Sequence, residues 1–264
     1  MRRASTLLAA LALLLAGCTT VPGGDGTPPP RAERWRPKPG LAWQWQLSGT
    51  LDASVDVPVY DIDGFDHPAA TVAGLRAAGR RVICYLSTGA WEEWRPDAAE
   101  FPEELLGKGN GWPGERWLDI RRTDVLEPLM AERIEMCRSK GFDAVEPDNM
   151  DGYANATGFP LTAADQLRYH RLIARLAHER GLAVGLKNDL DHIPELVGEL
   201  DFAVNEQCAQ YRECARLSPF VRAGKAVFHV EYELAADAFC PQARKLGLSS
   251  QRKRYELDAW REPC

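Results

Sequence analysis

The chain has 264 residues, of which 45% are hydrophobic and 27% are charged, and its formal net charge is −6. This acidic balance argues against nucleic acid or an anionic lipid surface as a partner and favours a cationic one. The length suffices for one large hydrophobic core rather than two, so we expect a single main domain.

The N-terminus has the three parts of a lipoprotein signal peptide. Arg2 and Arg3 precede an apolar run over residues 7–15, and the following Ala16-Gly17-Cys18 resembles the box whose cysteine becomes the lipidated first residue. The run is too short to span a bilayer. We expect residues 1–17 to be removed and Cys18 to carry lipid, palmitate included. An ordinary secretory signal that happens to contain a cysteine is the alternative.

This signal predicts an exported protein that is anchored in a membrane by lipid alone, in the periplasm or at the cell surface. The outer membrane is the expected location in a Gram-negative cell. Residues 18–40 are rich in proline and glycine and are predicted to form an extended tether to a functional domain over residues 41–264. Loss of the two signal-peptide arginines lowers the formal charge from −6 to −8. We expect a monomer.

The cysteine count predicts disulfides. Six cysteines besides Cys18 form an even set in an exported chain, which indicates two or three bridges. Four of them lie between residues 208 and 264, so we expect cross-links among these four, with the pairing left open. No Cys-x-x-Cys or close Cys/His spacing indicates zinc. The six are Cys84, Cys137, Cys208, Cys214, Cys240 and Cys264.

Short β-type runs alternate, for the most part, with helix-like segments. In the segment 162–180, Thr162 can cap a helix, apolar residues return at helical spacing, and Gly181 ends it. Eight such units predict an α/β protein with a parallel sheet closed into a single (β/α)₈ TIM barrel. An open doubly wound sheet is the runner-up, although no Gly-x-Gly-x-x-Gly turn follows the first strand. The predicted strands are 43–47, 58–62, 81–87, 117–120, 143–147, 182–187, 202–206 and 226–231, and the predicted helices are 68–78, 97–106, 124–139, 162–180, 192–199, 212–222 and 234–246.

Polar residues stand at the C-terminal end of each predicted strand. In a barrel these ends converge on one mouth, where active sites of this fold are built. A single polar tip is most often structural, because loops are polar anyway. The coincidence at eight strands predicts a site. The tips are Gln46, Asp61 with Asp63, Ser87, Asp119, Glu146 with Asp148, Lys187 to Asp189, Asn205 with Glu206, and Glu231.

Carboxylates dominate these tips, and paired carboxylates are the equipment of glycoside hydrolysis. The five histidines are scattered, and His229 is expected to be a hydrogen-bonded core residue rather than a base. No Gly-x-Ser-x-Gly elbow or phosphate loop occurs, and we expect no cofactor or metal. A metal-dependent hydrolase using Asp61, Asp63 and Asp119 is an alternative, although the segment 61–66 matches a calcium loop poorly.

Several motifs together resemble one family. The combination resembles glycoside-hydrolase family 114, the endo-α-1,4-polygalactosaminidases, over nearly all of residues 41–264. The resemblance implies a (β/α)₈ barrel that cleaves α-1,4-linked galactosamine polymers, with Asp148 and Glu206 as the catalytic carboxylates. The motifs are Trp43-Gln44-Trp45-Gln46, Tyr60-Asp61-Ile62-Asp63, Cys84 to Gly89, Trp117-Leu118-Asp119-Ile120, Gly141 to Tyr153, Leu186-Lys187-Asn188-Asp189, Asn205-Glu206-Gln207-Cys208 and Val230-Glu231-Tyr232.

We expect a retaining mechanism with Asp148 as nucleophile and Glu206 as general acid/base, with exchanged roles or inversion as alternatives. Glu146 is expected to pair with Lys187 and set the field around Asp148. If Ala203 faces the barrel interior, Glu206 can serve only after a strand irregularity, which we therefore predict. The predicted substrate-binding residues are Trp45, Gln46, Asp61, Asp63, Ser87, Asp119, Glu146, Asp151, Tyr153, Lys187, Asn188, Asp189, Asn205 and Glu231.

A polycationic aminosugar polymer suits an acidic chain with an acid-lined mouth, and the attraction should fade with salt. The alternative function is a cell-surface barrel that binds polysaccharide without cutting it. The two differ in whether a pair of carboxylates faces one sugar linkage.

Overall fold

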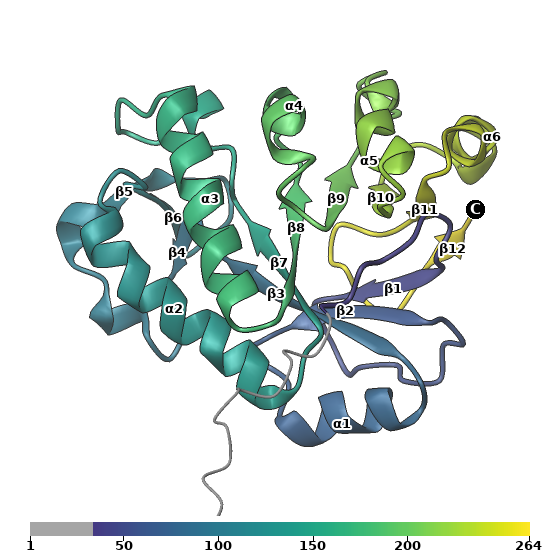
Figure 1. Ribbon diagram of the computed structural model, residues 1–264, viewed down its shortest axis with the longest axis horizontal. Helices are drawn as coiled ribbons and strands as arrows, with labels where there is room; N and C mark the ends of the chain where they lie inside the picture. Colours follow the sequence, from purple (N-terminus) through teal and green to yellow (C-terminus); the bar gives the residue numbers. More distant parts are fainter. Residues whose placement is uncertain (1–33) are drawn as a thin grey trace, which may run out of the picture. The chain divides into compact units, whose positions relative to one another are not determined.

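The computed structural model describes residues 34–264 (Figure 1). The expected signal peptide and the lipidation site Cys18 lie outside these residues. Within them, no helix combines the length and the apolar character needed to cross a bilayer. Part of the expected tether is included: the Arg34 guanidinium pairs with Asp201 at 3.1 Å, and the Trp35 ring lies 6.5 Å from that of Phe202. The first described residues, Arg34 and Trp35, therefore pack against the domain.

A nine-stranded sheet forms the centre of the domain. Eight of its strands pair in parallel and curl into a (β/α)₈ barrel with helices on the outside (Figure 1). In sheet order they are β1 (Trp43–Gln46), β2 (Val59–Asp63), β3 (Arg81–Ser87), β7 (Ala144–Asp148), β8 (Ala183–Lys187), β9 (Phe202–Glu206), β10 (Val227–Glu231) and β11 (Ser249–Arg252), with β12 (Glu262–Pro263) antiparallel at the end. The helices are α1 (Ala69–Ala77), α2 (Thr123–Lys140), α3 (Ala163–Glu179), α4 (Ile193–Leu196), α5 (Ser218–Arg222) and α6 (Ala236–Leu246).

Helix α3 forms as its sequence predicts. Thr162 is its N-cap and makes a capping box with Asp165, so two otherwise unpaired groups of the first turn are satisfied. Beyond its end, Gly181 has a φ of 76°, which glycine adopts without strain. The helices predicted at 192–199 and 212–222 are shorter than expected and begin as 3₁₀ turns at Leu190–His192 and Cys214–Leu217.

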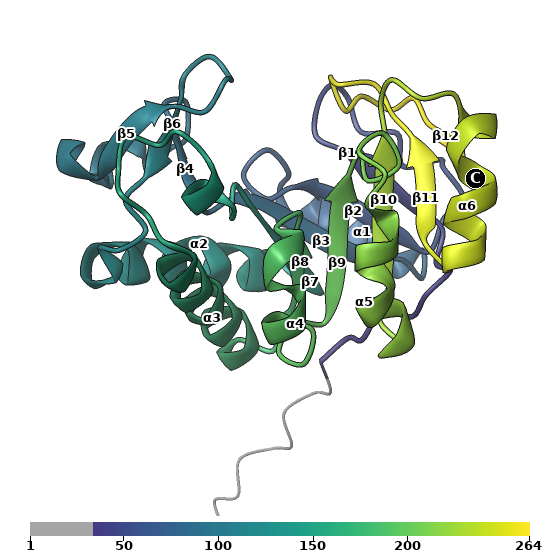
Figure 2. The same cartoon turned by 90° about the horizontal axis from the view of Figure 1, so that it is seen from above.

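Two predictions for residues 97–120, one strand and one helix, were wrong. The run 117–120 does not enter the barrel: it contributes to β6 (Glu115–Leu118), which pairs antiparallel with β4 (Ala90–Glu92) and β5 (Leu106–Gly109). The helix expected at 97–106 is replaced by 3₁₀ turns at Ala98–Glu100 and Glu103–Leu105. Strand β11 supplies the eighth barrel strand instead. The three-stranded sheet stands to one side of the barrel, away from β11 and α6 (Figure 2).

Strand alternation separates two cores. One set of buried apolar residues fills the barrel interior, and the other lies between the strands and the surrounding helices. Ala203 belongs to the outer core, so its neighbours Val204 and Phe202 face inward. Alternation then points Glu206 into the barrel mouth without any irregularity, and the pairing of β9 with β10 is in continuous register through Glu206. The predicted irregularity was wrong because its premise about Ala203 was wrong.

Three disulfides are present, as the cysteine count predicts, and two of them join the four C-terminal cysteines. The bond with the widest sequence separation, 53 residues, ties β3 to α2 and therefore constrains the unfolded chain most. The pairs are Cys84–Cys137, Cys208–Cys214 and Cys240–Cys264.

The three-stranded sheet is fastened to the barrel by a buried ion cluster. The Arg95 guanidinium donates to both carboxylate oxygens of Glu92, at 2.6 and 2.8 Å, and to both of Asp63, at 2.6 and 3.0 Å. All three residues are buried. A buried cation shared by two carboxylates joins the end of β2 to β4.

Replacing Arg95 with Met should lower the free energy of unfolding by about 3–5 kcal/mol, because it leaves two buried carboxylates without their cation. Urea denaturation monitored by circular dichroism measures this loss. Arg122→Met is the matched control, since Arg122 pairs with Asp124 at the exposed surface and should have little effect. Equal stability of the two variants would contradict the structural role of Arg95.

Candidate active site

Three barrel strands end in the same unusual way at the mouth. Directly after β7, β8 and β9 the backbone turns left-handed, with a φ of 62° at Asn149, 49° at Asn188, 40° at Asp189 and 60° at Gln207. Such conformations are rare for residues other than glycine and cluster at functional sites. Each turn follows an inward-facing charged residue at the end of its strand, so the chain leaves the barrel abruptly and the mouth stays open.

The site is built around the ammonium group of Lys187. Its Nζ lies 2.9 Å from Glu146 Oε1, 3.1 Å from Asp148 Oδ1 and 3.5 Å from Glu206 Oε2. It also lies 4.6 Å from the ring centroid of Trp45, a cation–π contact. Burial alone would lower the pKa of Lys187, but the three carboxylates raise it well above its usual value. The lysine therefore stays charged.

Asp148 is held as an anion. Burial would raise its pKa, but the charge of Lys187 and the Tyr85 hydroxyl, which donates to Oδ2 at 2.8 Å, together hold that pKa below its usual value. The backbone amides of Thr88 and Gly89 each donate to the Asp148 carbonyl at 3.1 Å. A side chain at Gly89 would collide with the backbone of Asn149, the residue after Asp148, so glycine is needed for this close approach. Both the charge and the position of Asp148 are thus fixed.

Glu206 is positioned mainly by Asn188. The Asn188 amide donates to Glu206 Oε2 at 3.0 Å, and its oxygen accepts from the Glu206 backbone N–H at 2.9 Å. The Tyr232 hydroxyl donates to the other carboxylate oxygen. The Glu206 side chain is 25% exposed, whereas that of Lys187 is 3% exposed. Glu206 therefore has a fixed orientation with one side open to the mouth.

Beneath these groups lies a carboxyl pair, Asp61 and Glu146, both fully buried. Burial and the adjacent charge of Glu146 raise the pKa of Asp61 well above its usual value, which favours its neutral, protonated form. The expected ion pair of Glu146 with Lys187 is present at 2.9 Å. Four acids lie together on the inner faces of β2, β7 and β9: Asp61, Glu146, Asp148 and Glu206. The proton of Asp61 and the charge of Lys187 offset two of their negative charges.

Two cavities flank Glu206 and share Asn188, Glu206 and Gln207. The central cavity, about 300 Å³, contains both candidate catalytic carboxylates. The acidic cavity, about 310 Å³, extends over the ends of β7 and β8. The central cavity is lined by Trp45, Leu47, Tyr85, Trp112, Glu115, Asp148, Asn149, Lys187, Asn188, Glu206, Gln207, Tyr232, Tyr255 and Leu257. The acidic cavity is lined by Asp151, Tyr153, Ala154, Asn188, Asp189, Leu190, Asp191, Asn205, Glu206, Gln207, Tyr211, Glu213 and Arg216.

Five of the predicted substrate-binding residues line the acidic cavity: Asp151, Tyr153, Asn188, Asp189 and Asn205. Burial, with the charges of Asp148 and Asp189, raises the pKa of Asp151 to about 6. The Tyr153 hydroxyl donates to Asp189 at 3.1 Å. The amide of Asn205, 1% exposed, donates to Asn188 at 3.3 Å.

Other predicted residues lie elsewhere and make structural contacts. Gln46 lies on the outer side of β1 and forms hydrogen bonds with the backbone of residues 48–52. Glu231 lies on the outer side of β10 and accepts hydrogen bonds from the His229 ring and the Ala209 backbone amide. Asp63 holds Arg95, and Asp119 follows β6 and pairs with Arg121. Ser87 accepts a hydrogen bond from Asn149. None of the five lines either cavity.

Four further residues line the central cavity and were not predicted from the sequence: Tyr85, Tyr232, Glu115 and Tyr255. Tyr85 could have been predicted from strand alternation, because it lies two residues before Ser87 on the same strand face. Tyr232 follows Val230, an inward-facing residue, by the same spacing. Glu115 and Tyr255 had no such signal, since they lie on the three-stranded sheet and on the segment after β11.

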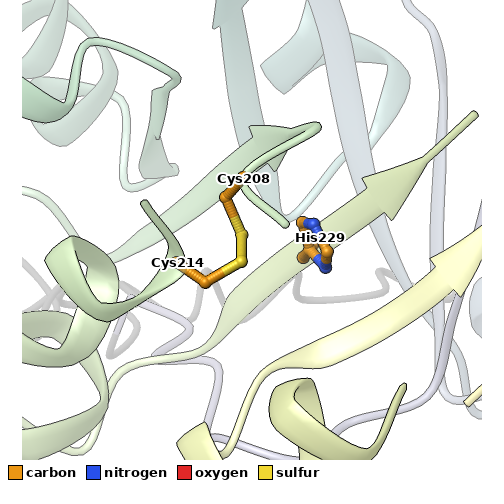
Figure 3. Close-up of side chains that lie close together, drawn as sticks. All are labelled: Cys208, Cys214 and His229. Atoms are coloured by element: carbon orange, nitrogen blue, oxygen red, sulfur yellow. A yellow bond between two sulfur atoms is a disulfide. The ribbon is translucent and has the colours of Figure 1, made fainter. Parts of the chain in front are cut away.

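Two groups of described residues bring potential metal ligands within 4.8 Å of one another. Cys208 and Cys214 lie beside His229 (Figure 3), but their sulfurs are joined in a disulfide and cannot bind as thiolates. His229 instead bonds Ser250 and Glu231, as its expected core role requires.

In the second group, Asp189 Oδ2 lies 2.7 Å from His170 Nε2 and 2.8 Å from His192 Nδ1. These are direct hydrogen bonds, and a metal ion would have to push the ligands apart. Neither group contains Asp61, Asp63 or Asp119, so the structure does not assemble the metal site of the alternative hydrolase.

A (β/α)₈ barrel with two carboxylates close together in its mouth is an arrangement found in glycoside hydrolases. Residues 25–264 match the sequence model of glycoside-hydrolase family GH114, and the chain belongs to this family. No protein with curated annotation matches the chain.

Solved structures agree. The chain is 41% identical to Aspergillus fumigatus Ega3, determined in complex with galactosamine, with a TM-score of 0.84 over 88% of this chain and 98% of that one. The glycoside hydrolase domain of PelA from Pseudomonas aeruginosa is 14% identical, with a TM-score of 0.68 over 85% and 98%. The α-galactosidase TtGalA from Thermus thermophilus, also 14% identical, has a TM-score of 0.54 over 84% and 59%. The last two are similar in fold.

Replacing Lys187 with Met should make stability fall more steeply as pH rises. Without the cation, the neighbouring carboxyls keep their protons in the folded state above the pH at which they lose them in the unfolded state. Stability is then highest near pH 4 and declines toward pH 8. Urea denaturation at several pH values measures the slope. Lys108→Met, at an exposed lysine, is the control, and parallel slopes for the two variants would contradict the central role of Lys187.

Proposed function

We propose that the protein is an endo-acting glycoside hydrolase that cleaves α-1,4-linked galactosamine-containing polysaccharide with Asp148 and Glu206. The observation that carries this proposal is the pair of carboxylates held by one lysine in the central cavity, where Glu206 also lines the acidic cavity. A relative 41% identical, Ega3, was solved in complex with galactosamine, which supports an aminosugar as the substrate.

The environments of the two acids suggest their roles. A nucleophile must be ionised, and the pKa of Asp148 lies below its usual value despite burial, because of Lys187 and Tyr85. Glu206 is the more open of the two and lies where the cavities meet, so it can reach a leaving-group oxygen and later a water. We assign Asp148 as nucleophile and Glu206 as general acid/base.

The spacing favours retention. Asp148 Oδ1 and Glu206 Oε2 both contact Lys187 Nζ, at 3.1 and 3.5 Å, so these oxygens are no farther apart than the sum of those distances. Retaining enzymes place their carboxyls about 5–5.5 Å apart, whereas inverting enzymes need about 6.5–9.5 Å to admit water. For this pair of oxygens the upper limit includes the retaining spacing and reaches only the lower end of the inverting range, which favours retention.

The cavities suit a long cationic chain. Cavities on both sides of Glu206 allow sugars on both sides of the cleaved bond, as endo action requires. Exposed aromatic rings of Trp112, Tyr211 and Tyr255, which are 45–62% exposed, offer faces on which sugar rings can stack. The acids of the acidic cavity exceed its single arginine, Arg216, which already pairs with Asp191. Protonated amino groups are attracted to such a lining.

For the location, we propose export and lipid anchoring through Cys18, with residues 18–33 linking the anchor to the domain. This part of the proposal is supported by the sequence alone. It places a monomeric enzyme at a membrane surface, in the periplasm or outside the cell, where an extracellular polysaccharide is accessible.

Asp148→Asn and Glu206→Gln should each reduce cleavage of partly deacetylated α-1,4-galactosamine polymer about 10³-fold or more, because each removes a group that acts on the breaking bond. Mass spectrometry of the products measures shortened oligomers. Glu132→Gln, at an exposed acid on the far side of α2, should cleave like the wild type.

Cleavage that persists in Asp148→Asn and Glu206→Gln would refute the site assignment. Binding without cleavage of any aminosugar polymer by the wild type would favour the alternative, a polysaccharide-binding barrel.

Tyr85→Phe should shift the acidic limb of the pH–activity profile to higher pH. The hydroxyl stabilises the ionised form of Asp148, so its loss raises the pKa of that carboxyl, and activity then disappears at a higher pH as the solution is acidified. Activity near pH 8 should change least, because Asp148 is still ionised there. Tyr60→Phe removes a buried hydroxyl on the outer face of β2 and should leave the limb in place. An unshifted limb in Tyr85→Phe would mean that another group controls it.

A further inference from the structure

Building on the proposed function, we propose that Glu115 binds a protonated amino group of the substrate and thereby selects deacetylated sugar units beside the cleavage point. Glu115 lies on β6 of the three-stranded sheet, outside the barrel, and lines the central cavity together with Asp148 and Glu206. The inference concerns a specificity-determining residue on an element that is not part of the (β/α)₈ fold.

The surroundings of Glu115 resemble a sugar subsite. Trp112, three residues earlier, lines the same cavity and is 59% exposed, so its ring is available to stack on a sugar. Asn110 holds both residues: its amide donates to Glu115 Oε2 at 2.6 Å, and its oxygen accepts from the Trp112 backbone at 3.1 Å. A carboxylate and an aromatic face are therefore set side by side.

This subsite has a fixed position relative to the catalytic centre. The Asn110 amide also contacts Asn149, the residue after Asp148, at 3.4 Å. Strand β6 pairs with β4, whose Glu92 is clamped to the barrel by Arg95. The strand that carries Glu115 is thus tied to the barrel at two points, beside Asp148 through Asn149 and at the end of β2 through Arg95.

A comparison with Glu92 shows why Glu115 is free to take a ligand. The two glutamates are opposite each other in the β4–β6 pairing. Glu92 is neutralised by the Arg95 guanidinium at 2.6 Å. Among residues 34–264, the Glu115 carboxylate has a hydrogen bond from Asn110 and no ion pair. An ammonium group on the substrate would supply the missing cation.

The charge of Glu115 depends on pH near neutrality. Burial raises its pKa to about 7, with a contribution from the negative charges of Glu92 and Asp148, while the Asn110 hydrogen bond and the charge of Arg95 oppose the increase. The residue is neutral below this pH and anionic above it. A bound ammonium group stabilises the anion, so binding of a cationic sugar should strengthen as pH rises from about 6 to about 7, while the amine still carries its proton.

The test compares wild type with Glu115→Gln on two polymers, one fully deacetylated and one largely N-acetylated, at pH 7. On the deacetylated polymer KM should rise about tenfold while kcat changes less than about twofold, because a charge-assisted contact is lost and the catalytic pair is untouched. On the acetylated polymer both constants should stay close to those of the wild type. The fall of KM between about pH 6 and 7 should disappear in Glu115→Gln.

Glu104→Gln is the matched control, since Glu104 is exposed on the same insertion and lies outside both cavities. Glu115→Asp keeps the charge and should retain the preference for the deacetylated polymer in part, which separates lost charge from lost folding. An unchanged KM ratio between the two polymers in Glu115→Gln would overturn the inference and leave the proposed function intact. A wild type that cleaves neither polymer would overturn both.

Discussion

The structure of the mouth depends on one buried cation. Lys187 contacts Glu146, Asp148 and Glu206 from the inner face of β8, with the Trp45 ring beneath it. Without the lysine, these carboxylates would have to take up protons, because several unpaired negative charges cannot be held close together in a buried site. With it, Asp148 stays ionised, and the excess negative charge is relieved lower in the barrel, where Asp61 keeps its proton.

The lysine also makes the two catalytic candidates unequal. Asp148 is closer to Nζ and accepts a hydrogen bond from Tyr85, both of which favour its anion. Glu206 lies farther from Nζ and accepts hydrogen bonds from Asn188 and Tyr232, neutral groups that fix its orientation without supplying a full charge. Pairs of carboxyls in unequal environments are the usual basis for dividing nucleophile and acid roles between them. A single ammonium group, placed asymmetrically, accounts for both the closeness and the difference.

The sequence predicted the barrel and the central acids because strand alternation and strand-end chemistry are local. It failed where the outcome depends on distant partners. The eighth strand, Ser249–Arg252, has no apolar or β-branched residue, and two of its buried side chains, Ser250 and Gln251, form hydrogen bonds with the distant partners His229 and Arg261. The predicted strand at 117–120 overlaps β6 (Glu115–Leu118), but so short a run cannot reveal which sheet it joins.

The same limit applies to single residues. A polar residue at a strand end can face the mouth or the helices, and one position along the strand decides which. Gln46 and Glu231 face outward because Trp45 and Val230 face inward. Asp63 has the inward position, yet a distant arginine, Arg95, occupies both of its oxygens. The missed tyrosines needed only the correct alternation, whereas the role of Glu115 required the position of a whole inserted sheet.

Charge compensation at the mouth explains why it suits a cationic polymer over a limited pH range. The two buried cations near it, Lys187 and Arg95, are each already matched by carboxylates. Further acidity comes from groups whose burial raises the pKa, Asp151 to about 6 and Glu115 to about 7. The lining therefore becomes more negative as pH rises through this interval. In the proposed function, attraction of an amino sugar is strongest where these acids are ionised and its amine is still protonated, which ties the pH range of binding to the burial of side chains that are not proposed to take part in bond cleavage.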